Sequence, residues 1–133
     1  MLCDASRGSD KSAKLALTLL RTIYLHCHGI VFDKPNNRIM KEYKANTEGY
    51  PREWMFEMCR RKGKSTKVDT SSHHVSRRSI RDRDDRKFVE ACSLTSDKIL
   101  ITSDRRYDDP PSRDLLKRLG ISLLGVAEAL DEL

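Results

Sequence analysis

Short runs of apolar, β-favouring residues alternate along this chain with longer stretches of helical periodicity. The apolar runs are "IVF" at 30–32, "ILIT" at 99–102 and "ISLLG" at 121–125, and each is continuous instead of alternating with polar residues. Strands buried on both faces have this pattern, whereas strands with one wet face alternate. The alternation of such strands with helices predicts a parallel sheet that helices cover on both sides.

The stretches between the apolar runs carry apolar residues at helical spacing. In the first of them, Ser9 can cap the start and Gly29 can end the helix in a left-handed turn. A further short strand is expected at the beginning of the chain, ending at Asp4. The length predicts a single domain, 1–133. Helices are expected over residues 9–29, 36–46, 51–62, 86–95, 112–118 and 126–133.

Positive charge is concentrated in "RRKGKSTKVDTSSHHVSRRSIR", residues 60–81. This stretch holds eight of the 26 Lys and Arg residues and one of the 20 acidic residues, so it carries +7 and the remainder of the chain carries −1. It is rich in Ser and Thr and nearly free of large apolar residues, which predicts a flexible loop at about 63–82. Two interpretations stay open, a solvated surface loop and a loop that binds phosphates.

The sequence lacks the features of a membrane or secreted protein. It has no run of about 18 apolar residues, and "MLCDAS" has neither the basic nor the apolar region of a signal peptide. The four cysteines lie far apart without a CxxC pair, which is not the pattern of a disulfide framework. We therefore expect a cytoplasmic protein with no membrane partner.

Four acidic residues fall where a parallel sheet would bring them to one edge. The carboxyl ends of the strands share that edge, the helices that follow strands begin there, and ligands bind there in open α/β sheets. Asp4 ends the first strand, and Asp104 follows "ILIT" by two residues. Asp85 begins the helix that leads into that strand, and Glu42 lies in the second turn of the helix after "IVF". We expect all four to converge.

Carboxylates gathered without matching Lys or Arg repel one another unless a cation binds between them. Mg²⁺ or Mn²⁺ suits such a group, because these hard ions bind through few carboxylates and keep their waters. The ion lowers the pKa of a bound water and holds a phosphate for in-line attack. Each acid also has a plainer interpretation: Asp85 as a helix-start residue, Asp104 as a turn former and Glu42 on a solvated helix face.

At this point the residues resemble the PIN-domain ribonuclease family. "LCDAS" is similar to that family's opening strand, which ends in Asp with Ser or Asn two residues later, here Asp4 and Ser6. "RIMKEYKAN" resembles the helix that carries the second acid, Glu42. "DRDDRKFVEACSLTSDKILITSDRRY" resembles the family's acid three residues before Phe, followed by an apolar strand and Thr-x-Asp, which places Asp85 and Asp104.

The resemblance covers about residues 1–47 and 83–133. It implies a three-layer α/β/α sandwich with a central parallel sheet of about four to five strands. It also implies a metal-dependent endonuclease that usually acts on RNA. Asp82 and Asp84 compete with Asp85 for the third acidic position.

The first functional hypothesis is an Mg²⁺- or Mn²⁺-dependent endoribonuclease. Asp4, Glu42, Asp85 and Asp104 would be its catalytic and metal-binding residues, and nearby hydroxyls would orient a carboxylate or a metal-bound water. These hydroxyls belong to Ser6, Thr102 and Ser103. Basic side chains would hold the RNA backbone without reading bases: Arg60, Arg61, Lys62, Lys64, Arg77, Arg78, Arg81, Arg105 and Arg106.

The biological setting under this hypothesis is the toxin of a toxin–antitoxin pair, RNA processing or another defence role. Its partners would be RNA, an antitoxin or other protein, and a second copy of the chain. The alternative hypothesis is a catalytically inactive module of the same fold that binds RNA or a protein. A third is a phosphatase or small-molecule hydrolase on an α/β scaffold.

Overall fold

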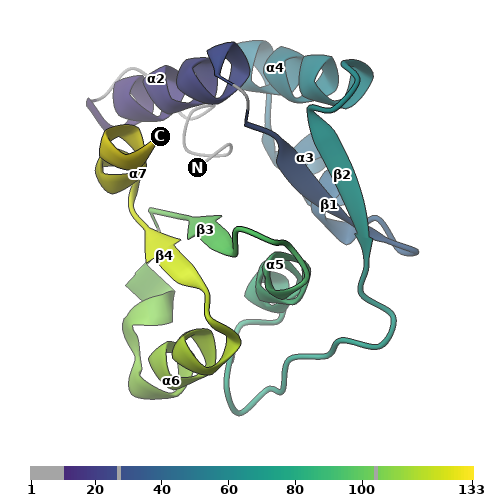
Figure 1. Cartoon of the computed structure of the whole chain (residues 1–133), viewed down its shortest axis with the longest axis vertical. Helices are drawn as coiled ribbons and strands as arrows, with labels where there is room; N and C mark the ends of the chain where they lie inside the picture. Colours follow the sequence, from purple (N-terminus) through teal and green to yellow (C-terminus); the bar gives the residue numbers. More distant parts are fainter. Residues whose placement is uncertain (1–10, 27, 104) are drawn as a thin grey trace.

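Figure 1 shows the computed structural model, which describes residues 11–26, 28–103 and 105–133. The described part is a mixed α/β fold, as the alternation of patterns predicts. No helix within it is long and apolar enough to cross a membrane. The helices are α2 (Lys11–Leu25), α3 (Arg38–Asn46), α4 (Gly49–Arg60), α5 (Arg83–Ser93), α6 (Pro110–Leu119) and α7 (Val126–Glu132), with a 3₁₀ turn η1 (Arg105–Asp108). The strands are β1 (Ile30–Lys34), β2 (Ser65–Asp69), β3 (Ile99–Ile101) and β4 (Ser122–Leu124).

The four described strands form two parallel pairs. β1 pairs with β2, with Ile30 opposite Ser65, and β3 pairs with β4, with Ile99 opposite Ser122. The parallel arrangement agrees with the prediction made from continuous apolar runs. A single sheet of four to five strands is not present among residues 11–26, 28–103 and 105–133. The strand expected to end at Asp4 lies outside the described residues.

The prediction of an unbroken loop over residues 63–82 is wrong, because residues 65–69 are β2. The strand is mostly polar, with Val68 partly buried and Thr66 and Lys67 facing solvent. The strand is held mainly by backbone hydrogen bonds to β1. Just before it, the Lys64 carbonyl accepts a further hydrogen bond from the Ile30 N–H at 2.9 Å. Because such a strand is mostly polar, its composition does not distinguish it from a loop.

Buried apolar side chains form two clusters. The larger lies among β1, α2, α3 and α4, where Leu19, Phe32, Met55 and Met58 are almost fully buried. Trp54 joins them, and its indole Nε1 donates to the Leu20 carbonyl at 2.7 Å. The apolar face of α4, made by Trp54, Met55 and Met58, therefore belongs to the core. The smaller cluster lies around α5, α6 and β4 and consists of Ile80, Val89, Cys92, Tyr107, Leu116 and Ile121.

The end of α2 differs from the prediction of a left-handed glycine cap. Gly29 does not have a positive φ, and α2 ends at Leu25. The ammonium of Lys64 instead donates to the Tyr24, His26 and His28 carbonyls, which satisfies carbonyls that the last helical turn leaves open. Gly29 is needed for a close approach, because a Cβ there would lie 3.1 Å from the Lys64 carbonyl oxygen.

Candidate acidic site at the carboxyl ends of the strands

Glu42 of α3 and the first turn of α5 are joined by Lys87. Glu42 is in the second turn of α3, as predicted, and its Oε1 lies 3.1 Å from the Nζ of Lys87. The same ammonium donates to the Asp84 carbonyl at 2.8 Å. One lysine therefore joins α3 to the start of α5. Beside it, the Tyr43 and Phe88 rings contact with centroids 5.8 Å apart.

Three aspartates occupy the start of α5, and the structure gives each a different position. Asp82 is the N-cap residue, and its side chain accepts a hydrogen bond from the Asp84 backbone N–H at 2.9 Å. Asp84 is exposed, and its carbonyl holds Lys87. Asp85 is buried, with 7% of its surface exposed. Burial thus distinguishes Asp85 from the two other candidates for the third acidic position. Asp82 caps the helix, and Asp84 lies on the exposed face.

The turn after β3 packs against this same end of α5. Tyr107, in η1, is buried, and its hydroxyl lies 3.5 Å from the Asp85 carbonyl oxygen. Thr102 continues the β3–β4 pairing through its N–H, which donates to the Leu124 carbonyl at 3.0 Å, and Ser103 is exposed. Tyr107 comes three residues after the predicted acid at 104. That acid lies outside the described residues, together with Asp4 and Ser6.

A second polar group lies beside the first and was not predicted. Asp33, near the end of β1, is completely buried. Its carboxylate accepts hydrogen bonds from Ile39 N–H at 2.8 Å, Arg38 N–H at 3.1 Å and Arg38 Nε at 3.3 Å. Burial raises the pKa of Asp33, but the hydrogen bonds from the first turn of α3 and from Arg38 outweigh it and lower that pKa below its ordinary value.

Arg38 connects Asp33 to α5 and to the segment after β2. Its Nη2 donates to Glu90 Oε2 at 2.8 Å, and this hydrogen bond is the main reason that the pKa of Arg38 is raised. Glu90 is 4% exposed, and its other oxygen accepts from the Val75 N–H at 3.1 Å. The network is thus a structural tie among β1, α3, α5 and the chain near Val75.

The predicted basic residues fall into two groups, because β2 separates them. Residues 60–64 lie between α4 and β2, at the amino end of β2 (Figure 1). The five residues of β2 span about 13 Å at about 3.3 Å per residue. Arg60 and Arg61 pair with Glu57, and Lys64 holds the end of α2. β2 therefore separates this group from the basic residues that follow it.

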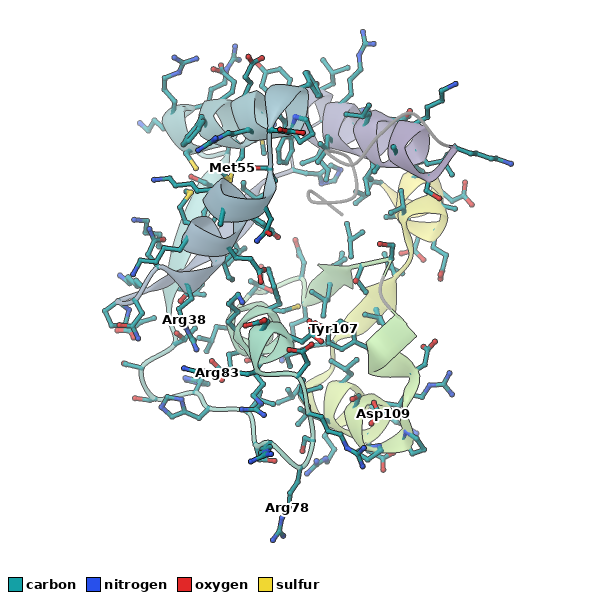
Figure 2. The ribbon with its side chains drawn as sticks, turned by 180° about the vertical axis from the view of Figure 1, so that it is seen from behind. Arg38, Met55, Arg78, Arg83, Tyr107 and Asp109 are labelled. Carbon is teal, nitrogen blue, oxygen red and sulfur yellow. The ribbon has the colours of Figure 1, made fainter. Side chains whose placement is uncertain are left out.

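Three further arginines of the predicted set lie between the carboxyl end of β2 and the start of α5. Arg77, Arg78 and Arg81 are exposed, and Figure 2 shows Arg78 pointing away from the body of the molecule. The chain between them is fastened by Ile80, which is buried, and by the Ser79 carbonyl, which accepts from Ser112 Oγ at 3.1 Å. The side chains of Arg105 and Arg106 lie outside the described part.

The donor set must be tested against the metal that the family resemblance implies. Among the described residues, no three His, Cys, Asp or Glu side chains group closely enough to hold a metal ion. Glu42 and the buried Asp85 are carboxylates, and Mg²⁺ binds through one or two carboxylates plus water and phosphate oxygens. The two residues fit that chemistry. However, the expectation that the acids lack a matching base is wrong for Glu42, because Lys87 pairs with it.

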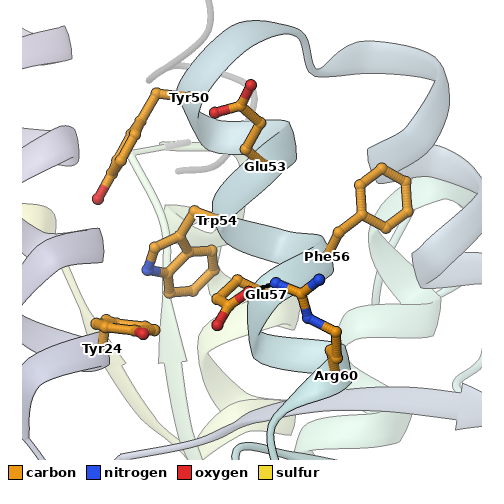
Figure 3. Close-up of a pocket in the computed structure, with 7 residues that line it drawn as sticks. All are labelled: Tyr24, Tyr50, Glu53, Trp54, Phe56, Glu57 and Arg60. Atoms are coloured by element: carbon orange, nitrogen blue, oxygen red, sulfur yellow. Dashed lines mark hydrogen bonds and ion pairs between the residues drawn. The ribbon is translucent and has the colours of Figure 1, made fainter.

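A hollow of about 590 Å³ lies at the opposite end of the molecule, between α2 and α4. Figure 3 shows Tyr24, Tyr50 and Trp54 around it, with Glu57 beside Arg60. Trp54 belongs to the core, and Glu57 is paired with Arg60 and Arg61. The other polar residues that line the hollow are Tyr24, Tyr50 and Glu53.

Sequence reasoning missed Asp33, Arg38, Glu90 and Lys87, although part of the signal was present. Asp33 directly follows the apolar run "IVF", which is the same pattern that singled out Asp4. Lys87 lies four residues before the buried Ala91 and so belongs to the inner face of α5. Only the packing of α3 against α5 reveals that Lys87 contacts Glu42.

The chain matches no protein-family model, no curated protein and no solved structure.

Proposed function

We propose that the protein is a metal-dependent endoribonuclease whose site lies at the carboxyl ends of the strands. The observation that carries the proposal is the meeting of Glu42 with the first turn of α5, where Asp85 is buried. These two acids are 43 positions apart in the chain, and they are the two members of the predicted set that the described residues contain. Lys87, which contacts the Glu42 carboxylate and the Asp84 carbonyl, links the two elements that carry them.

The described residues of the proposed site have separate roles. Glu42 and Asp85 would hold the divalent ion, and Tyr107 keeps the turn after β3 against the Asp85 backbone. A bound Mg²⁺ or Mn²⁺ supplies an activated water and neutralises charge on the phosphodiester. The exposed arginines at 77, 78 and 81 would hold the RNA backbone, since cationic side chains bind phosphates without reading sequence.

The proposal also includes finer features that the family resemblance implies. These are a single central sheet of four to five strands and the participation of Asp4 and Asp104, which lie outside the described residues. The toxin of a toxin–antitoxin pair remains the proposed setting. Ser6, Thr102 and Ser103 remain proposed as residues that orient the site.

Cleavage of labelled single-stranded and structured RNAs tests the proposal. The reaction is run with Mn²⁺, with chelator, and with Asp85→Asn and Glu42→Gln. Asp97→Asn is the matched control, because Asp97 is an exposed aspartate in the turn between α5 and β3. We expect metal-dependent cleavage that Asp85→Asn and Glu42→Gln reduce by about 100-fold or more and Asp97→Asn leaves unchanged. Cleavage that survives Asp85→Asn would contradict the proposal.

A comparison of two triple variants tests the RNA-binding side. Each variant removes three positive charges, so a general electrostatic effect would weaken both equally. We expect loss of RNA affinity, measured by fluorescence anisotropy, for the group after β2 and little change for the group before it. Equal losses would show that position relative to the acids does not matter. The groups are Arg77, Arg78 and Arg81, and Arg60, Arg61 and Lys62, all changed to Ala.

The pairing of Lys87 with Glu42 favours a second candidate, a binding module of the same fold that does not cut. A carboxylate that already has a cation needs a metal less than an isolated one does. Mn²⁺ calorimetry separates the two candidates. A folded protein that binds labelled RNA but gives no Mn²⁺ heat and no cleavage would favour the binding module.

A further inference from the structure

The hollow between α2 and α4 is lined mostly by aromatic rings, and two of its lining side chains lack a partner in the described part of the chain. Its volume of about 590 Å³ lies within the range of ligand pockets, which are about 300–1,000 Å³ and mostly apolar. The Tyr50 ring is 49% exposed. Neither it nor the Glu53 carboxylate forms a hydrogen bond, ion pair or ring contact with another described residue. A ligand could therefore use both groups without breaking an existing contact.

The lining comes from one face of α4 and from the last turns of α2. Tyr50, Glu53, Trp54 and Glu57 follow one another at i, i+3, i+4 and i+7, so they lie on the same side of α4. Trp54 is fixed in place, because its Nε1 donates to a backbone carbonyl of α2 at 2.7 Å. Figure 3 shows its indole between Tyr50 and Tyr24, which belongs to α2. The rings are thus positioned before any ligand arrives.

The charge of the lining favours a cation. Two carboxylates and one guanidinium line the hollow, which gives a formal charge of −1. Arg60 is paired with Glu57, and so is Arg61 beside the lining, which leaves Glu53 without a cation among the described residues. The rings add to this preference, because the face of an aromatic ring attracts positive charge. The guanidinium carbon of Arg61 lies 5.0 Å from the Tyr24 centroid, so one ring of the hollow already contacts a cation.

The remaining rings and acceptors indicate the class of cation. Lys44 Nζ and Arg52 Cζ lie 5.8 and 6.0 Å from the Phe56 centroid, whereas no cation of the described chain lies over the ring of Tyr50. A primary ammonium needs acceptors for three N–H donors, and the lining offers one unpaired carboxylate, that of Glu53. A quaternary ammonium has no N–H to satisfy and binds through ring faces, as it does in aromatic cages.

We propose that the hollow between α2 and α4 binds a small organic cation that carries a quaternary ammonium group. The cation lies against Tyr50 and Trp54, with Tyr24 on the side of α2, and Glu53 balances its charge. The site is separate from the proposed acidic site, and the inference does not depend on the ribonuclease proposal.

The fluorescence of Trp54 tests the inference directly, because Trp54 is the single tryptophan of the chain and lines the hollow. Tetramethylammonium and choline are titrated into the full chain, with sodium chloride at equal ionic strength as the blank. The neutral isostere of choline, in which carbon replaces the nitrogen, has the same shape without the charge. Calorimetry measures the same affinities independently.

Four variants locate the binding. Tyr50→Leu removes the ring, and Tyr50→Phe keeps it without the hydroxyl. Glu53→Gln removes the charge, and Glu132→Gln is its matched control, because Glu132 is an exposed glutamate of α7 outside the lining. Circular dichroism checks that each variant is folded.

We expect both cations to bind the wild type and the neutral isostere to bind at least about tenfold more weakly. Tyr50→Leu and Glu53→Gln should each weaken binding by at least about fivefold, whereas Tyr50→Phe and Glu132→Gln should leave it unchanged. If Tyr50→Leu does not fold, Glu53→Gln and the isostere still decide.

Several results would overturn the inference. Equal binding of choline and its neutral isostere would show an apolar hollow without preference for charge. Unchanged binding in Tyr50→Leu would place the cation elsewhere, and the absence of any binding by the folded wild type up to about 10 mM would leave no site. Single-stranded RNA that shifts the Trp54 fluorescence where the cations do not would assign the hollow to nucleobases instead.

Discussion

Asp33→Asn is the substitution that best tests the buried network at the end of β1. The change keeps the shape of the side chain but replaces a charged acceptor with an amide. The amide oxygen could still accept from the Ile39 N–H, but the amide NH₂ group would face the Arg38 N–H and Nε–H, which are donors too. Two hydrogen bonds to a charged, fully buried acceptor would be lost.

The expected cost follows from those two bonds. A hydrogen bond to a charged group contributes about 1.5–3 kcal/mol, and breaking one side of a buried ion pair costs about 3–5 kcal/mol. Arg38 keeps its bond to Glu90, and its side chain is 39% exposed, so water relieves part of the loss. We therefore expect the free energy of unfolding to fall by about 3 kcal/mol, the lower end of that range.

Urea denaturation followed by circular dichroism measures this change, with Asp97→Asn as the control that removes an exposed aspartate. We expect an unchanged m-value for both variants and an unchanged midpoint for the control. A loss of less than about 1 kcal/mol for Asp33→Asn would refute the reasoning, because the carboxylate would then add no more than one ordinary neutral hydrogen bond.

The stability difference between the wild type and Asp33→Asn should also depend on pH. The pKa of Asp33 is lower in the folded protein than in the unfolded chain, where it is about 3.9. Its contribution is therefore fully present above about pH 4 and is lost as the pH falls through the lower, folded pKa. The stability difference between the wild type and Asp33→Asn should stay constant from about pH 7 to 5 and shrink in more acidic buffer. A difference that grows on acidification would contradict the assigned sign.

Three further outcomes are expected. Lys64→Met should lower the free energy of unfolding by about 1–3 kcal/mol, because it leaves the carbonyls at the end of α2 without a donor. The control, Lys62→Met at an exposed position, should have no measurable effect in the same urea titration. Trp54→Phe removes the donor to the Leu20 carbonyl and should cost about 1–3 kcal/mol by thermal denaturation without changing RNA affinity. Burial raises the pKa of the Cys92 thiol to about 11, so about one thiol in a thousand is ionised at pH 8, and mass spectrometry should show alkylation of Cys92 only after denaturant is added.

The parts of the fold that the sequence predicted share a physical cause. α2 buries Ala13, Ala16, Leu20 and Ile23 at helical spacing, so its periodicity can be read from the sequence. The apolar run of β3 located that strand, although Ile99 is exposed and the strand has no fully buried residue. The parallel pairing of the strands followed from continuous apolar runs. The location of β2 could not be found this way, because Ser65, Thr66 and Lys67 pair through backbone atoms that every residue type provides.

The candidate site stays a prediction, and the structure adds one contact to it, the pairing of Lys87 with Glu42. Whether a base also lies there depends on which face of α5 meets α3, and that is decided by the packing of Tyr43 against Phe88. For that reason the sequence alone did not indicate that Lys87, two residues from Asp85, contacts Glu42.

The fastening of the chain after β2 has a consequence for the entropy of binding. Val75 is held by Glu90, Ile80 is buried, and Arg86 donates to the Ile80 carbonyl at 2.8 Å. The backbone that carries the exposed arginines therefore loses little freedom when a polyanion binds, and mainly the side chains must be ordered. If three of them contact a single strand, the affinity should fall with a slope of about −2 in log K against log salt, a value set by charge alone and not by the folding of a loop.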